Sequence, residues 1–597
     1  MPVLRGDISN TPLEAWRRAL EKTAPISRNS ALTLPLLIDD LAGRFDGAPA
    51  LLGDDASLSY RALAERCNRY ARWALAQGLT EGKVVCLLMP NSPDYMAIWL
   101  GVTRVGGIVA LVNTSLVGSQ LAHAIGIVAP AAIIVAAEYA GSVAAVLPDL
   151  GPGIQCWAHG ANGQGFTRLD DLIERGAGDR LAGSEYRPPS ISDQALYIYT
   201  SGTTGLPKAA KVSHFRLMQW THWFAGMMDT RPTDRMYLCL PMYHSIGGVT
   251  APGAMLVNGG SVLLRRRFSA SRFWDEVIEG NCTVFQYIGE LCRYLVNGPP
   301  HPRERQHRLR LCCGNGLRAD VWREFEQRFQ VPRIVEFYAA TEGNFSLYNC
   351  EGKPGAIGRV PAFLAHRFPM ALIKCHPDTG EPVRNDKGFC IRCTTNEVGE
   401  AIGKIDDGSR SGSRFEGYTD QEATDKKILR DVFAQGDAWF CSGDLMRKDE
   451  SGYFYFVDRA GDTFRWKGEN VSTTEVAEAI ATCPGVIEAV VYGVTIPGTE
   501  GRAGMAAVVC SRGFHVARFR QHLVERLPEY ARPLFLRICE EIEITATFKQ
   551  RKQALSGEGY DPAAITDPLY FNDRERAAFV TLDRALHERI CRGELRL

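Results

Sequence analysis

The sequence has no excess of charge of either sign and no long uninterrupted apolar run. Lysine plus arginine and aspartate plus glutamate each number 68, so the formal net charge is zero. A neutral chain lacks the basic surface on which nucleic-acid binding depends, and we expect no nucleic-acid partner. The two most apolar stretches, 95–112 and 124–137, are interrupted by Arg104 and Pro130 and fall short of the roughly 20 apolar residues of a membrane span. We therefore expect no transmembrane segment, while peripheral membrane contact is left open.

Cysteine is dilute, and its spacing suggests neither a disulfide framework nor a metal site. The chain has 17 cysteines in 597 residues, and its first residues lack the apolar core of a secretory signal. One Cys-x-x-Cys pair, Cys390 and Cys393, has no second ligand pair nearby, which a tetrahedral zinc site requires. The alternation around it is typical of a strand that carries two thiols. We expect free thiols and a cytoplasmic location, with peripheral contact at the inner face of the cell membrane left open.

Helix and strand patterns alternate along most of the chain. Residues 58–78 repeat apolar positions at helical spacing, and residues 83–90 form a short apolar run that ends at a proline. The same alternation of helix and strand continues further along the chain and predicts an α/β fold with mainly parallel strands. Residues 150–192 are rich in Gly, Ser and Pro, and we expect a loop or a subdomain join there.

The alternation of helix and strand ends near residues 440–475, where the sequence becomes rich in charged residues and glycine-containing turns. Beyond them the sequence predicts a helix at 474–483, a strand pair and a further helix at 515–526, which together make a small α+β unit. A chain of 597 residues is too long for one ordinary core. We therefore expect two domains, residues 1–459 and 460–597.

A phosphate-holding loop is expected at YTSGTTGLPK, residues 199–208. Its glycines allow close backbone approach, successive N–H groups can form an anion-binding nest, and its hydroxyls and Lys208 add donors and charge. A Walker-type P-loop would need Gly-Lys followed by Ser or Thr, whereas Pro207 precedes Lys208 and Ala209 follows it. This residue pattern argues against a kinase or a P-loop ATPase. The alternative, a Gly- and Thr-rich surface turn, leaves unexplained why a strand, hydroxyls, glycines and a lysine occur together.

The stretch YTSGTTGLPK resembles the signature of the adenylate-forming enzymes, which include acyl-CoA synthetases, adenylation domains and luciferases. Further motifs of this superfamily follow in order: PMYHSIGG at 241–248, YAATEG at 338–343, SGD at 442–444 and DRAGDTFRWKGENVS at 458–472. FYAATEGN and TATFKQRK are most similar to the fatty acid transport protein branch, which comprises long- and very-long-chain acyl-CoA synthetases and has bacterial members. The resemblance implies a large N-terminal domain of mainly parallel sheets flanked by helices, a β-barrel-like subdomain, and a small mobile C-terminal α+β domain.

The resemblance implies ATP-dependent long-chain to very-long-chain fatty acyl-CoA synthesis in two steps. Fatty acid and ATP give acyl-AMP and pyrophosphate, and acyl-AMP and coenzyme A then give acyl-CoA and AMP. The implied cofactors are ATP and Mg2+, with coenzyme A as a substrate. Two alternatives stay open: a fatty acyl-AMP ligase that passes the acyl group to a carrier protein, and a lipid-uptake protein that acts by vectorial acylation. The sequence alone determines neither the chain length of the acid nor whether the protein is a homodimer.

The resemblance also assigns residues to the nucleotide. The loop residues expected at the β- and γ-phosphates are Thr200, Ser201, Gly202, Thr203, Thr204, Gly205 and Lys208. Glu342 matches the magnesium ligand and Thr341 the α-phosphate contact, and one glutamate is enough because a cation that bridges phosphates commonly takes one or two protein carboxylates. The residues expected at adenine and ribose are Gly314, Asn315, Gly316, Tyr338, Asp444 and Arg459. Without the motifs, Tyr338 would be read as a core aromatic, and Asp444 with Arg459 as a surface salt bridge.

Four residues are expected to act on the reacting groups: Lys549, Thr203, Lys208 and His244. Lys549 is in register with the family's adenylation lysine and would neutralise charge on the acyl carboxylate and the α-phosphate, with Lys552 as a nearby rival. His244 is expected to gate and position the acyl carboxylate, and a core histidine is the alternative. Tyr287 and Ile288 complete the expected acyl pocket.

A hinge is expected at Gly461 and Asp462, where many relatives have Asp or Lys in place of the glycine. Family members rotate the small domain after adenylation, and glycine absorbs such a backbone change readily. After rotation, one turn would help to form the channel for coenzyme A; its residues are Trp466, Lys467, Gly468, Glu469 and Asn470.

Overall fold

The computed structural model divides the chain into two compact units. One consists of Met1–Pro369 with Lys404–Leu429, and the other of Met370–Gly403 with Arg430–Leu597. The structure describes residues 11–160, 163, 165–201, 206–376, 380–406, 414–460, 462–466, 469–497, 499, 501–542 and 552–595. The expected division into residues 1–459 and 460–597 stays a prediction.

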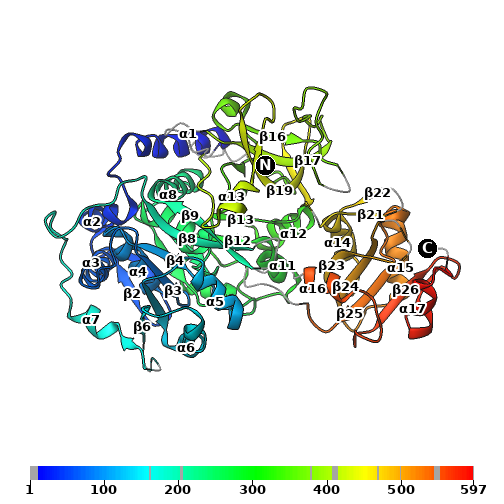
Figure 1. Cartoon of the computed structure of the whole chain (residues 1–597), viewed down its shortest axis with the longest axis horizontal. Coiled ribbons are helices and arrows are strands. Elements are labelled where there is room, and N and C mark those ends of the chain that lie inside the picture. The colour runs from blue at the N-terminus through cyan, green and yellow to red at the C-terminus, as the bar shows by residue number, and fades with distance from the viewer. Residues whose placement is uncertain are drawn as a thin grey trace. The chain divides into compact units, whose positions relative to one another are not determined.

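The first unit contains a seven-stranded sheet in the order β7-β6-β5-β3-β4-β8-β9 (Figure 1). Its strands are β3 (Val84–Leu88), β4 (Ile108–Leu111), β5 (Ala132–Ala136), β6 (Gln155–His159), β7 (Thr167–Arg168), β8 (Gln194–Ser201) and β9 (Pro207–Ser213). All neighbours are parallel except β8 and β9. The expectation of a loop or join over 150–192 was therefore incomplete, because the strands β6 and β7 and a helix lie within this Gly- and Pro-rich stretch.

An eight-stranded sheet in the order β15-β14-β13-β12-β10-β11-β1-β2 completes the sheets of this unit. Its strands are β1 (Pro49–Leu52), β2 (Ser57–Ser59), β10 (Arg235–Leu238), β11 (Ser261–Leu264), β12 (Val284–Ile288), β13 (Leu311–Asn315), β14 (Ile334–Ala339) and β15 (Ser346–Asn349). The inner strands are parallel, and only the edge strands β2 and β15 pair antiparallel. This confirms the predicted α/β architecture with mainly parallel strands.

Helices cover these sheets where the sequence shows helical spacing. They are α1 (Pro12–Thr23), α2 (Leu34–Phe45), α3 (Tyr60–Ala76), α4 (Pro93–Arg104), α5 (Gly118–Gly126), α6 (Ala140–Val146), α7 (Asp170–Arg175), α8 (His214–Met228), α9 (Ala251–Leu256), α10 (Phe273–Glu279), α11 (Gly289–Asn297), α12 (Ala319–Phe329) and α13 (Gln421–Asp425). The helix expected at 58–78 is α3, whose cap Ser59 accepts the N–H of Ala62. Helix α1 packs along α8, where Trp16 meets Trp223 edge to face at 5.7 Å.

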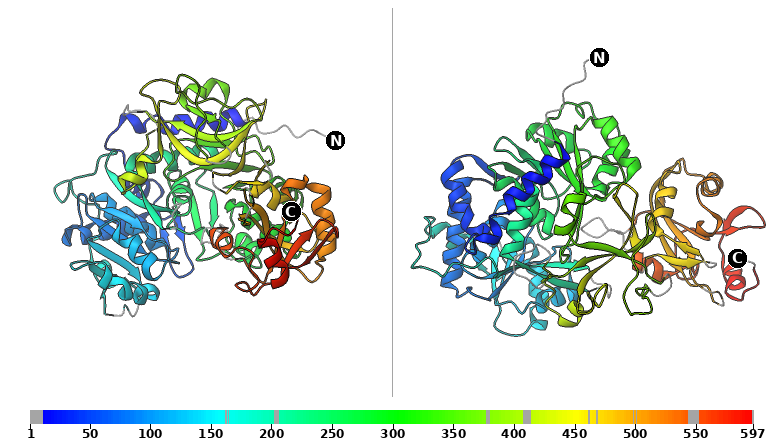
Figure 2. Two further views of the ribbon diagram at one scale, coloured as in Figure 1. Left: turned by 45° about the vertical axis from the view of Figure 1, so that its right-hand side comes forward. Right: turned by 90° about the horizontal axis from the view of Figure 1, so that it is seen from above.

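The second unit begins with a curled sheet that forms a half-barrel (Figure 2). Its strands are β16 (Met370–Ile373), β17 (Val398–Lys404), β18 (Ile428–Arg430), β19 (Ala438–Lys448) and β20 (Phe454–Arg459). The Cys-x-x-Cys segment is extended beside it, but it pairs through single-residue bridges at Cys390 and Arg392, so the expected strand is not a regular one. No disulfide joins the described cysteines, and the described residues hold no cluster of three or more His, Cys, Asp or Glu suited to a metal.

The C-terminal part of this unit is the predicted α+β fold. Its sheet has the order β23-β24-β25-β26-β27, and a short hairpin, β21-β22, precedes it. The elements are β21 (Phe464–Trp466), β22 (Glu469–Val471), α14 (Thr473–Ala481), β23 (Val486–Val494), β24 (Ala503–Cys510), α15 (Val516–Arg526), β25 (Phe535–Cys539), α16 (Lys552–Glu558), β26 (Leu569–Asp573), β27 (Ala578–Thr581) and α17 (Arg584–Cys591). The helices expected at 474–483 and 515–526 are α14 and α15. Beyond the pattern that the sequence predicted, a β26-β27 hairpin extends the sheet.

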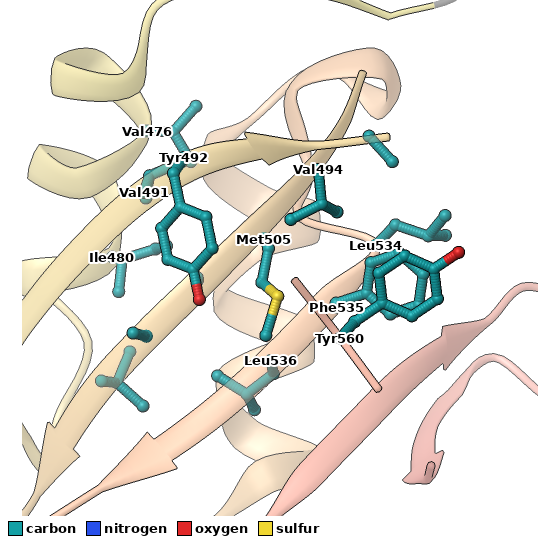
Figure 3. Close-up of a cluster of buried hydrophobic side chains, with 14 of the residues drawn as sticks. Val476, Ile480, Val491, Tyr492, Val494, Met505, Leu534, Phe535, Leu536 and Tyr560 are labelled. Carbon is teal, nitrogen blue, oxygen red and sulfur yellow. The ribbon is translucent and has the colours of Figure 1, made fainter. Parts of the chain in front are cut away.

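One apolar core holds this α+β fold together. Figure 3 shows Val476 and Ile480 of α14 lying over β23 and β24, with Met505 among the buried side chains. Further along the sheet, the rings of Phe535 and Tyr560 stack 4.1 Å apart, which fixes the segment after α16 against β25. In neither unit do the described residues include a helix with both the length and the apolarity to cross a membrane.

Candidate active site

The two arms of the expected phosphate loop are paired strands. In the β8-β9 ladder, Thr200 lies opposite Lys208 and Ser201 lies opposite Pro207. Residues directly opposite in an antiparallel pair project to the same face, so Thr200 and Lys208 belong to one surface. Gly202, Thr203, Thr204 and Gly205 lie outside the described residues, and their phosphate contacts stay predictions.

The residues expected around adenine lie at the carboxyl ends of neighbouring parallel strands. In the ladders, Gly314 of β13 lies opposite Tyr287 of β12 and Glu336 of β14. Ligands of α/β folds bind outside such strand ends. A Cβ on Gly314 would lie 2.3 Å from the Tyr287 carbonyl oxygen, so the strands approach this closely only because the residue is glycine.

Tyr338 and Tyr287 have different surroundings. Tyr338 is partly exposed at the end of β14, and its ring stacks with that of Phe345 at 5.8 Å. Tyr287 is fully buried, and its hydroxyl donates to Glu336 at 2.6 Å. The other Glu336 oxygen accepts the N–H of Leu317 at 3.0 Å, which ties the turn after Gly316 to β14. Burial raises the pKa of Glu336 to about 8, because the charged carboxylate is poorly solvated there.

The turn that follows β14 brings Thr341 and Glu342 to two different neighbours. The Thr341 hydroxyl lies 3.0 Å from the Ser245 hydroxyl, and Glu342 accepts a hydrogen bond from Tyr418 at 2.8 Å. The Thr200 side chain lies close enough to the Tyr418 phenol to lower its pKa. Burial and the neighbouring Glu342 carboxylate raise the pKa of Tyr418, which keeps the phenol protonated and able to donate. Glu342 and the β8 arm of the phosphate hairpin thus meet at one side chain.

His244 precedes a π-helical turn over Ile246–Thr250. Such turns are rare and occur frequently at functional sites. The chain folds back tightly here: a Cβ on Gly247 would lie 2.3 Å from the Pro241 oxygen, and one on Gly248 would lie 1.8 Å from the Met242 oxygen. The glycines of PMYHSIGG are therefore required by the turn, which fixes where the half-buried His244 lies.

In the second unit, the expected ribose residues are cross-strand partners. Asp444 of β19 lies opposite Arg459 of β20, with Arg459 Nε 3.6 Å from Asp444 Oδ1. The Asp444 side chain is 12% exposed and the Arg459 side chain 49%, so the carboxylate is held by the sheet while the guanidinium reaches solvent. The motif residues before Asp444 are fixed as well, because the Gly443 N–H donates to Glu400 at 3.0 Å.

The segment after Arg459 contains the expected hinge and meets the rival lysine. The Asp462 N–H donates to the Arg459 oxygen, while Gly461 and Lys549 lie outside the described residues. Lys552 donates to the Thr473 hydroxyl at 2.6 Å and to Asp462 Oδ2 at 3.3 Å. Lys552 is thus engaged by residues of its own unit.

The expected coenzyme A turn is the tip of the β21-β22 hairpin, with Trp466 opposite Glu469. Lys467 and Gly468, at its tip, lie outside the described residues, and for Asn470 the backbone alone is described. Trp466 is 4% exposed and belongs to the core of its unit. Its contact with coenzyme A stays a prediction.

The surroundings of Glu342 fit a magnesium ion held mainly by phosphates. Among the described residues, the one hydrogen bond to this carboxylate comes from Tyr418 to Oε1, which leaves Oε2 for a cation. The described residues hold no group of three or more His, Cys, Asp or Glu suited to a metal there. Magnesium commonly takes one or two protein carboxylates and fills its octahedron with phosphate oxygens and water.

Two side chains of this region were missed by the sequence reasoning. Tyr418 follows a Gly- and Ser-rich stretch and has no pattern that marks it. Glu336 did have a signal, because a charged residue inside the apolar run IVEFY predicts a buried carboxyl with dedicated partners.

Two family models match different parts of the chain. Residues 38–388 match the family model described as AMP-binding enzyme, and residues 475–549 match the AMP-binding enzyme C-terminal domain. Long-chain fatty acid transport protein 1 of Mus musculus is 40% identical over 578 residues, covering 96% of this chain and 89% of that protein. Long-chain fatty acid transport protein 3 of Mus musculus is 42% identical over 533 residues, covering 88% and 79%.

Solved structures show the same fold. ATP-bound MatB from Rhodopseudomonas palustris aligns with a TM-score of 0.73 at 23% identity, covering 88% of this chain and 99% of that one. A Mycobacterium tuberculosis fatty acyl CoA synthetase aligns with a TM-score of 0.60 at 22% identity, covering 88% and 98%. The chain belongs to the AMP-binding enzyme family, the adenylate-forming superfamily, and is a homologue of the long-chain fatty acid transport proteins.

Proposed function

We propose that this protein is an ATP-dependent long-chain fatty acyl-CoA synthetase. The observation that carries the proposal is the meeting of Thr200, Glu342 and Tyr418, which joins a phosphate hairpin to a carboxylate suited to magnesium. Family membership supports the adenylating chemistry, and the relatives named for long-chain fatty acids support the class of acid.

A carboxylate is a poor electrophile, so a thioester forms at neutral pH only after activation. In the first step the acid attacks the α-phosphorus of ATP, and pyrophosphate leaves. Negative charge builds up on that phosphorus, and preorganised donors stabilise it best. We assign the β- and γ-phosphates to the hairpin with Thr200 and Lys208, and the α-phosphate to Thr341. When bound, Mg2+ would supply Lewis-acid stabilisation of the phosphates, with Glu342 as its protein ligand.

The remaining nucleotide contacts follow from chemistry. A fixed aspartate can accept both ribose hydroxyls, and Asp444 is fixed by β19 with Arg459 opposite it. Tyr338 offers a partly exposed ring beside Gly314–Gly316 for adenine. We place His244 and Ile288 at the acyl carboxylate and the acyl chain, and Lys549 at the α-phosphate.

In the second step the thiol of coenzyme A attacks the acyl carbon, and AMP leaves. We propose that residues 460–597 move about Gly461 and Asp462 between the two steps. The β21-β22 turn would then help to form the channel for coenzyme A in the thioester-forming step. Cellular fatty acid uptake would follow from trapping the acid as its CoA ester. We propose a cytoplasmic enzyme with peripheral contact at the membrane's inner face.

A pyrophosphate-release assay across a ladder of fatty acids, each with and without coenzyme A, tests the proposal. We expect release with long-chain acids, followed by formation of acyl-CoA and AMP when coenzyme A is present. Accumulated acyl-AMP with no consumption of coenzyme A would instead identify the acyl-AMP ligase. Formation of ADP in place of AMP and pyrophosphate would refute adenylation altogether.

A further inference from the structure

Tyr418 contacts residues from three separate parts of the candidate active site. Its hydroxyl donates to Glu342 Oε1 at 2.8 Å, and the Thr200 side chain lies near the same phenol. The Lys208 ammonium lies 5.8 Å from the centroid of its ring, within the range of a cation–π interaction. One buried side chain therefore touches both arms of the phosphate hairpin and the carboxylate suited to magnesium.

The backbone around Tyr418 is fixed to strand β9. The Lys211 N–H donates to the Gly417 oxygen at 3.0 Å, and the Thr419 N–H donates to the Ala209 oxygen at 3.0 Å. These two bonds flank Tyr418, which is 2% exposed. The phenol therefore has little freedom of its own, and its position follows that of the phosphate hairpin.

Helix α8 anchors the two segments that meet at Tyr418. Near its start, Arg216 donates to the oxygen of Gly343, the residue after Glu342, at 2.5 Å. Ser213 is the N-cap of the same helix. Its hydroxyl donates to Glu416 Oε1 at 2.5 Å, and its N–H donates to Glu416 Oε2 at 2.8 Å. The turn that carries Glu342 and the segment that carries Tyr418 are thus held by the same helix end.

We propose that Tyr418 is a positioning residue that orients Glu342 for a divalent cation and couples this carboxylate to the phosphate hairpin. The inference rests on the adenylation function proposed above. The phenol donates to Oε1 and so leaves Oε2 for the cation. Its ring faces the Lys208 ammonium, and its backbone neighbours are bonded to β9, which couples it to the phosphate hairpin. A hydrogen bond from the protein to a metal-ligating carboxylate fixes its orientation, and loss of such partners typically costs about 10- to 100-fold in metal affinity or activity.

The test compares Tyr418→Phe with Tyr237→Phe in the full-length protein. The control removes a comparable hydroxyl, since Tyr237 is also buried and donates to a glutamate, Glu276, at 2.7 Å, among residues with no part in the proposed chemistry. The probes are the Mn2+–ATP complex, followed by electron paramagnetic resonance, and ATP alone in EDTA, followed by calorimetry. We expect Tyr418→Phe to raise the Kd of Mn2+–ATP about 10-fold and to leave the Kd of metal-free ATP unchanged.

Further outcomes decide between metal positioning and a structural role. In a Glu342→Gln background, Tyr418→Phe should add no further loss of Mn2+–ATP affinity, because the carboxylate it orients is gone. An unchanged Kd for Mn2+–ATP, an equal rise for ATP with and without metal, or loss of the fold by circular dichroism would each overturn the assignment. Failure of the proposed function would show differently, as wild-type protein that binds Mn2+–ATP but releases no pyrophosphate with any fatty acid.

Discussion

Asp444 and Arg459 face each other across the β19-β20 hairpin, with the guanidinium Nε 3.6 Å from the carboxylate. The strands fix both backbones before any nucleotide arrives. Because the carboxylate is largely buried and the guanidinium is half exposed, the aspartate is the preorganised member of the pair. Its role at the ribose can therefore be tested without rebuilding the sheet.

Asp444→Asn should weaken ATP binding about 10- to 100-fold, because a hydrogen bond to a charged group contributes about 1.5 to 3 kcal/mol. The Kd of ATP, measured by calorimetry, is the readout. Asp449→Asn is the matched control, since Asp449 lies in the turn of the same hairpin and accepts the Tyr455 hydroxyl at 2.9 Å. Equal ATP affinity in wild type and Asp444→Asn would contradict the ribose role.

Lys549→Ala should lose acyl-AMP formation by roughly 100- to 1000-fold, the usual cost of removing one preorganised donor at a developing charge. The variant should still pass a supplied acyl-AMP to coenzyme A, because that charge belongs to the first step. Both half-reactions are measured separately, the first by pyrophosphate release and the second by acyl-CoA formation. Normal acyl-AMP formation would show that the assignment is wrong.

Lys552→Ala is the matched control for this lysine. It removes hydrogen bonds to Thr473 and Asp462, so we expect a loss of about 1 kcal/mol in the stability of its unit. Adenylation by the folded variant should stay within a few-fold of wild type. If Lys552→Ala abolished adenylation and Lys549→Ala did not, Lys552 would be the adenylation lysine in place of Lys549.

Much of this architecture could be predicted from the sequence because local pattern and burial agree. Helix α3 shows helical spacing and ends before Gly78, and β3 is a continuous apolar run that ends before Pro90. Strands β6 and β7 could not be predicted, since short strands among glycines and prolines have no continuous apolar run to mark them.

The candidate site was predictable where motifs are long and local. Asp444 and Arg459 were expected in one site, and the sheet register brings them together. Tyr418 was not expected, because its role arises from a backbone bridge to β9 and from a contact with Glu342, which is distant in sequence. Such tertiary pairings have no signature in the local sequence.

Gly314→Ala should destabilise the first unit by about 1 to 3 kcal/mol, the usual cost of overpacking. The added methyl would lie 2.3 Å from the Tyr287 oxygen and 2.4 Å from its ring, where backbone as well as side chain must shift. Gly43→Ala in helix α2 is the control, because a Cβ there meets nothing within 4 Å and alanine favours a helix. Thermal unfolding compares the two, and a wild-type melting temperature for Gly314→Ala would contradict the close approach.

Glu336→Gln should flatten the dependence of stability on pH. Burial raises the pKa of Glu336 to about 8 from an ordinary 4.5, so the folded protein favours the protonated carboxyl. The resulting stabilisation is complete below about pH 4.5 and is lost progressively as pH rises toward 8, by at most about 1.4 kcal/mol per pH unit. Glutamine has no proton to lose, yet it can still accept the Leu317 N–H. Urea unfolding of both proteins between pH 5.5 and 8.5 measures the difference in slope, and parallel curves would show that Glu336 ionises as easily in the folded as in the unfolded chain.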